Sequence, residues 1–154
     1  MNHIFDPQAW ADLVVRSGAK YAGYVSEHAD HFSLWDSQVN PVNSVNYGPI
    51  LPLETKRANP YYLTDRAFCE NWKAKVLEVV DRYDPDIIYF DSRAIIISED
   101  CRFEMLKHFY EKKKDGIMTY KWEDFPSGTG MYQEMRRAFM FVHLTKHHVE
   151  VLMY

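Results

Sequence analysis

The run Pro-Asp-Ile-Ile-Tyr-Phe-Asp at residues 85–91 constrains the fold more than any other part of the chain. Its proline ends the preceding helical pattern, because the residue before a proline is disfavoured in helical conformation. Ile87, Ile88 and Phe90 are β-branched or aromatic, which is typical of a parallel strand covered on both faces. Asp91 follows at the carboxyl end of this strand, where parallel α/β enzymes place catalytic groups. The simpler alternative is that Asp91 caps the next loop or helix.

Helical and strand patterns alternate along the chain. Capping residues mark the helix starts, and glycines mark two of the helix ends. The predicted helices begin after Asp6, at Thr64 or Asp65, and after Ser98, and the first and third end near Gly18 and Gly116. The predicted strands are residues 20–26, 86–91 and 117–121. This alternation predicts an α/β fold of parallel βα units, about four where a complete barrel has eight. The predicted fold class is therefore a partial or shortened (β/α) TIM-barrel-like fold with parallel strands.

Apolar side chains recur at helical spacing in all three predicted helices. The stripes are Ala9, Trp10, Leu13 and Val14 in the first, Phe68, Trp72, Val76, Val79 and Tyr83 in the second, and Phe103, Leu106 and Phe109 in the third. We expect these stripes to form the core. Cys69 and Cys101 both fall on predicted helices, so neither a disulfide framework nor a thiolate metal site is expected.

Length and composition limit the size class and the partners. With 154 residues, the chain is expected to be one domain over residues 1–154, short of the roughly 250 residues of a complete barrel. A net charge of −4 gives no general attraction to nucleic acid or to an anionic membrane, so neither is an expected partner. The first residues lack the basic and apolar regions of a signal peptide, so the chain as given is expected to be cytoplasmic.

Three separated blocks of sequence resemble the α-L-fucosidase family of glycoside hydrolases. Residues 27–37, which follow the first predicted strand, are similar to the family pattern Lys-His-His-Asp-Gly-Phe-x-Leu-Trp-x-Ser. Residues 83–91 resemble the strand that carries the family nucleophile, and residues 118–130 resemble the strand and loop after it. The resemblance covers most of residues 3–137 and implies a catalytic barrel.

Two stretches depart from the family pattern. Between Pro49 and Pro60 the chain is irregular and polar, where the family would supply another βα unit. Residues 138–154 do not resemble the downstream barrel and are expected to form a divergent C-terminal segment. An incomplete barrel exposes sheet edges, so a homo-oligomer is expected. The missing units also leave open an inactive fucosidase fragment that acts as a sugar-binding or partner-interaction module.

The resemblance implies a retaining glycosidase, which uses two carboxyl groups and no cofactor. Asp91 matches the family nucleophile in motif and position. Glu134 is the only carboxylate in the region that matches the family acid/base motif, one place off the simplest alignment, and a solvated helix carboxylate is the alternative. The implied substrate is a fucosylated glycan or a fucoside.

Four further residues match substrate-binding positions of the family: His28, Trp35, Tyr89 and Lys121. His28 matches the first of two paired histidines, and Ala29 replaces the second, which removes one sugar contact. Trp35 could pack on the apolar face of a sugar. Tyr89 and Lys121 stand where the family often has an aromatic and a basic residue. For Trp35, Tyr89 and Lys121, packing inside the barrel is the alternative.

Metal binding is a competing interpretation of the histidines. The candidate ligands are His28, Asp30 and His31 in one group and His143, His147 and His148 in another. Within the second group, two histidines spaced by four residues would share a helix face. Neither group has a complete ligand pattern, so no metal site is expected.

Overall fold

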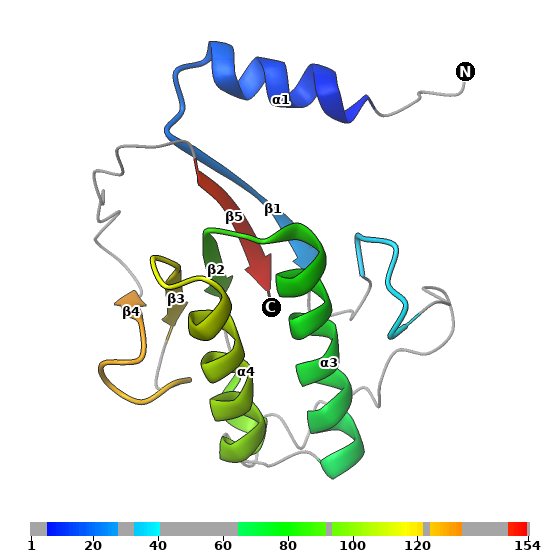
Figure 1. Ribbon diagram of the computed structural model, residues 1–154, viewed down its shortest axis with the longest axis vertical. Helices are drawn as coiled ribbons and strands as arrows, with labels where there is room; N and C mark the ends of the chain where they lie inside the picture. Colours follow the sequence, from blue (N-terminus) through cyan, green and yellow to red (C-terminus); the bar gives the residue numbers. More distant parts are fainter. Residues whose placement is uncertain are drawn as a thin grey trace, which may run out of the picture.

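The computed structural model describes residues 6–27, 33–40, 65–91, 94–121, 124–133 and 148–153. These residues form a parallel sheet and three α-helices (Figure 1). The helices are α1 (Pro7–Arg16), α3 (Arg66–Tyr83) and α4 (Glu99–Lys112), with a 3₁₀ turn, η1, at Ala94–Ile96. The strands are β1 (Tyr21–Glu27), β2 (Ile87–Phe90), β3 (Ile117–Lys121), β4 (Met131–Gln133) and β5 (His148–Met153). The predicted α/β class and the parallel strands are confirmed.

The strand order is β1-β5-β2-β3-β4, and every neighbouring pair is parallel. β5 lies within residues 138–154, where the sequence predicted no strand. It pairs with β1 on one side and with β2 on the other. In a sheet of consecutive βα units, that place belongs to a strand that lies between β1 and β2 in the chain. β1 and β4 are the edge strands of the described sheet, so barrel closure stays a prediction.

The helix starts follow the predicted caps. The Asp6 side chain accepts hydrogen bonds from two backbone N–H groups of α1, and the Asp65 side chain accepts one from Phe68 in α3. α4 begins after Ser98 as predicted but ends at Lys112. The predicted end near Gly116 is four residues too late, because the chain has already turned toward β3. A Cβ atom on Gly116 would lie 2.6 Å from the Phe109 ring, so this turn needs a glycine.

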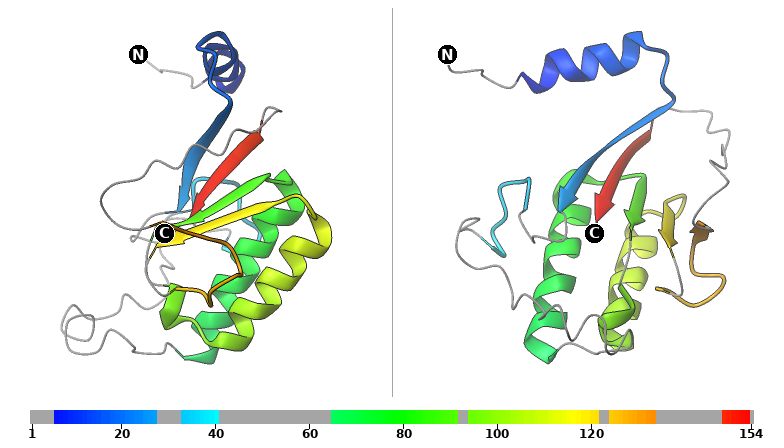
Figure 2. Two further views of the ribbon diagram at one scale, coloured as in Figure 1. Left: turned by 90° about the vertical axis from the view of Figure 1, so that its left-hand side faces the viewer. Right: turned by 180° about the vertical axis from the view of Figure 1, so that it is seen from behind.

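Helices α3 and α4 cover one face of the sheet (Figure 2). The buried strand residues on this face are Ile88, Phe90, Met118 and Tyr120. They pack in one core with Trp72, Val76, Val79 and Val80 of α3 and with Cys101, Met105, Leu106 and Phe109 of α4. Phe103 is 45% exposed, so its predicted inward position is wrong. The helical period turns positions 101, 105 and 109 toward the sheet and position 103 away from it.

The two faces of the sheet differ in burial because side chains alternate along each strand. Tyr89, Thr119 and Lys121 are half-buried, whereas their neighbours on the helix-covered face are buried. Asp91, two residues after Tyr89, is also half-buried. These four residues lie on what we call the second face.

Helix α1 lies beyond one end of the sheet (Figure 1) and buries none of its residues. Trp10 and Leu13 are 60% and 53% exposed. The predicted apolar stripe is therefore present, but its predicted place in the core is wrong. Tyr83, the last residue of the α3 stripe, is also exposed. No helix among the described residues is both long enough and apolar enough to span a membrane.

Candidate functional site

Three of the predicted site residues meet at the carboxyl ends of β2 and β3. Tyr89 and Asp91 are two residues apart, so their side chains lie on the same face. Lys121 ends β3, and the register that pairs Phe90 with Tyr120 brings Lys121 beside Asp91. The Tyr89 hydroxyl donates a hydrogen bond to Asp91 Oδ1 at 2.6 Å. The Lys121 ammonium donates to the same oxygen in an ion pair. We call Tyr89, Asp91 and Lys121 the Asp91 cluster.

The Asp91 cluster favours an ionised carboxylate. The hydrogen bonds with Asp91 and Tyr89 raise the pKa of Lys121 above its ordinary value, so its ammonium stays charged at neutral pH. Burial, and then the hydrogen bond to Asp91, raises the pKa of Tyr89 to about 12, so the phenol stays protonated and can donate. A cation and a hydroxyl donor on one oxygen both stabilise the anion.

The same cluster keeps contact with solvent. The side chains of Asp91 and Lys121 are 25% and 24% exposed. An ionised and accessible carboxylate can attack an electrophilic carbon or stabilise positive charge that develops on a substrate. Lys121 and Tyr89 contact this carboxylate through their polar groups. They therefore do more than pack inside the fold, which was the alternative interpretation of both residues. Their roles in catalysis stay predictions.

Trp35 lies in the core against α3. It is 6% exposed, and its indole N–H donates to Glu78 Oε2 at 2.9 Å. The Ser37 hydroxyl donates to the same oxygen at 2.7 Å, and the Gln38 backbone N–H donates to Glu78 Oε1 at 2.6 Å. Burial alone would raise the pKa of Glu78, but these hydrogen bonds and one from Arg82 outweigh it and lower the pKa to about 2. These surroundings match the packing alternative for Trp35, and its sugar contact stays a prediction.

The end of β1 carries a buried ion pair that was not predicted from the sequence. Lys75 Nζ donates to both carboxylate oxygens of Glu27, at 2.7 and 2.6 Å, and the two side chains are 6% and 2% exposed. A signal was present in α3, because Lys75 shares the core-facing side with Trp72 and Val76, and a buried ammonium needs a carboxylate partner. Because Glu27 bonds to α3, its side chain lies on the helix-covered face. It therefore cannot complete the Asp91 cluster on the second face.

Two predicted site residues, His28 and Glu134, lie outside the described residues. Of the histidine groups, only His148, the first residue of β5, is described. Within the part of the chain that the structure describes, no group of three or more metal-ligating side chains comes together.

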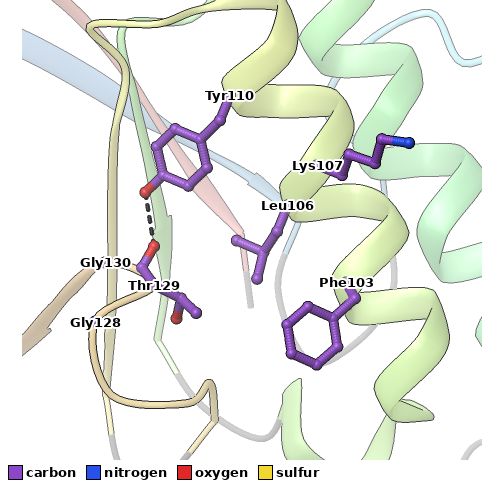
Figure 3. A pocket seen from close by; sticks show the side chains of 7 residues that line it. All are labelled: Phe103, Leu106, Lys107, Tyr110, Gly128, Thr129 and Gly130. Atoms are coloured by element: carbon purple, nitrogen blue, oxygen red, sulfur yellow. Dashed lines mark hydrogen bonds between the residues drawn. The ribbon is translucent and has the colours of Figure 1, made fainter.

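A pocket of about 520 Å³ lies between α4 and the loop before β4 (Figure 3). Its lining residues are Phe103, Leu106, Lys107 and Tyr110 of α4 and Gly128, Thr129 and Gly130 of the loop. The Tyr110 hydroxyl donates to the Thr129 carbonyl oxygen at 2.7 Å and so ties the loop to the helix. None of the Asp91 cluster lines this pocket, which is therefore separate from the predicted site.

Comparisons with known proteins agree with the motif resemblance. The family model described as alpha-L-fucosidase matches residues 1–56. A curated relative, the alpha-L-fucosidase of Dictyostelium discoideum, is 28% identical over an alignment of 119 residues, and the match covers 57% of this chain and 26% of that protein. The chain thus spans about a quarter of the length of this relative. A search of solved structures found no match. The resemblance to the α-L-fucosidase family is confirmed.

Proposed function

We propose, on the premise that this chain is related to the α-L-fucosidases, that it carries the nucleophile of a retaining glycoside hydrolase that releases terminal α-linked L-fucose. One observation carries the proposal: Asp91 directly follows the parallel strand β2 as an accessible carboxylate, with Tyr89 and Lys121 bonded to one of its oxygens. Both donors hold the group charged and oriented before substrate arrives. A nucleophilic carboxylate needs both properties.

The reaction runs in two steps. First, a carboxylate oxygen of Asp91 forms a bond to the anomeric carbon of fucose while the bond to the leaving oxygen breaks, and Glu134 gives its proton to that oxygen. Second, a water molecule attacks the anomeric carbon and passes a proton to the Glu134 carboxylate. The bond between Asp91 and the sugar breaks as the bond to water forms, which releases fucose and restores the Asp91 carboxylate. His28 and Trp35 are the proposed sugar contacts.

The course of β4 supports Glu134 as the acid. Lys121 pairs with Gln133, the last residue of β4, so β4 ends at the same edge of the sheet as Asp91. β2 and β4 lie on either side of β3, which puts about 10 Å between the two strands. Side chains that approach each other from that separation can bring two carboxyl groups to the roughly 5–5.5 Å of a retaining enzyme.

The decisive experiment measures hydrolysis of an aryl α-L-fucoside by the purified chain. We expect Asp91→Gly to lower kcat by about a thousandfold or more, and added azide to restore part of the rate as fucosyl azide forms. Asp86→Asn is the matched control, because Asp86 precedes the same strand at its opposite end, 3.2 Å from Lys113 Nζ. The assignment is wrong if Asp91→Gly keeps a kcat comparable to that of the wild type.

A second candidate function is a fucosidase-like module without hydrolytic activity, which binds sugar or a partner. The position of Trp35 favours it, because this proposed sugar contact is 6% exposed in the core. Under this alternative the purified chain leaves the aryl fucoside intact, while saturation-transfer NMR detects bound L-fucose.

We also propose that the chain forms a homo-oligomer. The described sheet has two edge strands, β1 and β4, and edge strands pair readily with other chains. Light scattering at micromolar concentration should report a mass above that of one chain. A single species of monomer mass would contradict this.

A further inference from the structure

The ladder between β2 and β3 ends one residue before the ion pair of the Asp91 cluster. Its last pair is Phe90 with Tyr120, whereas the ion pair joins the residues that follow each of them. Strand ends beyond a ladder fray easily. Asp91 and Lys121 therefore need support from outside this ladder to stay at bonding distance.

Phe125 supplies such support from the helix-covered face of the sheet. Its ring centre lies 5.2 Å from that of Phe90 and 5.4 Å from that of Tyr120. All three rings are buried, at 4% exposure or less. Phe125 thus contacts the residue before Asp91 and the residue before Lys121 at once. Tilted and edge-on ring contacts at this spacing hold aromatic side chains together beyond the effect of burial alone.

Asp124 connects the same region to the chain after Asp91. Its side chain is buried, and Asp124 Oδ1 accepts a hydrogen bond at 3.2 Å from the backbone N–H of Ile95, in the turn η1 that follows Asp91. Arg102 of α4 donates to the Asp124 carbonyl oxygen. The Arg102 guanidinium also lies over the Phe125 ring, 5.9 Å from its centre. Through Arg102, α4 therefore holds both Asp124 and Phe125 in place.

We propose that Asp124 and Phe125 are positioning residues, which hold the end of β2 and the end of β3 so that Asp91 and Lys121 stay in contact. The inference rests on the proposed function in that Asp91 is the nucleophile. Neither residue touches the reacting atoms in this scheme. Phe125 fixes the strand ends before the ion pair, and Asp124 fixes the backbone after Asp91.

The first test follows the Lys121 ammonium and needs no enzymatic activity. Only a neutral amine reacts with acetic anhydride, so loss of the contact with Asp91 should speed acetylation of Lys121. We expect Phe125→Leu and Asp124→Ala to raise its labelling at pH 8 about tenfold, the effect of one pKa unit, relative to exposed Lys107. Asp124→Asn should remain close to wild type, because its amide oxygen can still accept from Ile95.

Two further variants and one further lysine serve as controls. Tyr110→Phe removes the hydrogen bond that ties the far end of the same loop to α4, so it should leave Lys121 labelling unchanged. Asp91→Asn should raise it directly. Buried Lys75 reports on the whole fold. Unchanged Lys121 labelling in both Phe125→Leu and Asp124→Ala would overturn the proposal, and so would an equal rise at Lys121 and Lys75, which reports general unfolding.

The second test uses hydrolysis of the aryl fucoside. A displaced nucleophile should lower kcat by about 10–100-fold in Phe125→Leu and Asp124→Ala and leave KM within about twofold. A rise in KM at unchanged kcat would contradict a role at the nucleophile. If the wild type hydrolyses no fucoside, the proposed function fails, while the labelling still decides whether Asp124 and Phe125 hold Lys121 on Asp91.

Discussion

Helices α1 and α3 begin with the same kind of signal and lie in opposite environments. Each follows an aspartate whose side chain accepts hydrogen bonds from N–H groups of the first turn, and each carries an apolar stripe. α3 buries its stripe at Trp72, Val76 and Val79, whereas α1 buries no residue and leaves Trp10 and Leu13 more than half exposed.

The difference separates helix formation from helix burial. Caps and spacing decide whether a helix forms, and an opposing surface decides whether it is buried. α3 packs against α4 and the sheet, while α1 lies beyond the end of the sheet (Figure 1). The match to the family model, residues 1–56, includes the exposed helix. The Asp91 cluster, in contrast, lies on the well-packed part of the molecule.

The greatest loss of stability is expected from a change in the packed helix α4. Phe109 is fully buried, so Phe109→Ala should lower the free energy of unfolding by about 3–5 kcal/mol. Leu13→Ala, on exposed α1, should change it by less than about 0.5 kcal/mol. Urea unfolding followed by circular dichroism measures both. A similar loss for Leu13→Ala would show that α1 is packed in solution, as α3 is.

The next effect concerns the ion pair that joins β1 to α3. Lys75→Met leaves the Glu27 carboxylate buried without its ammonium partner, so the free energy of unfolding should fall by about 3 kcal/mol or more, as for other broken buried ion pairs. The double variant Glu27→Leu with Lys75→Met should regain much of this loss. Urea unfolding at pH 7 is again suitable. A loss below about 1 kcal/mol for the single variant would mean that β1 is not anchored through this pair.

A pH effect should follow from Glu78, which holds residues 35–38 on α3. Its folded-state pKa of about 2 lies below the unfolded value near 4.3. Its stabilising contribution is therefore complete above about pH 4.3 and is lost as the pH falls toward 2, by about 2–3 kcal/mol. Thermal unfolding between pH 5 and pH 2.5 should show a shallower decline in Glu78→Gln. If the unfolding temperatures of the variant and the wild type fall equally with pH, Glu78 is not the cause of the acid sensitivity.

The smallest effect on stability is expected at the exposed stripe of α1. Trp10→Ser with Leu13→Ser should change the free energy of unfolding by less than about 0.5 kcal/mol. If the stripe is a contact between copies, the mass seen by light scattering should fall toward that of one chain. Arg16→Ser, on the same helix, is the control and should keep the wild-type mass. An unchanged mass in the double variant would place the contact elsewhere, for example at the edge strands.

The candidate site was predictable where its signal was local. Asp91 could be found because an apolar strand leads directly into a carboxylate. Tyr89 came from the motif resemblance, and the two-residue period of the strand puts it on the same face as Asp91. Lys121 came from the motif resemblance, and its contact with Asp91 depends on the pairing of β2 with β3. Trp35 shows the limit of motif reading, because its buried hydrogen bond to Glu78 joins residues 43 positions apart.

Local patterns in the sequence are enough to predict where α1, α3 and α4 begin, where three of the strands lie, and which strand leads into a carboxylate. These features depend on caps, spacing and steric preference within a few residues. Three features became known only from the folded chain: β5 lies between β1 and β2, Lys75 bonds to Glu27, and the α1 stripe is exposed. Each of these depends on which distant surface is available for pairing, and a strand or an apolar stripe in the sequence does not name its partner.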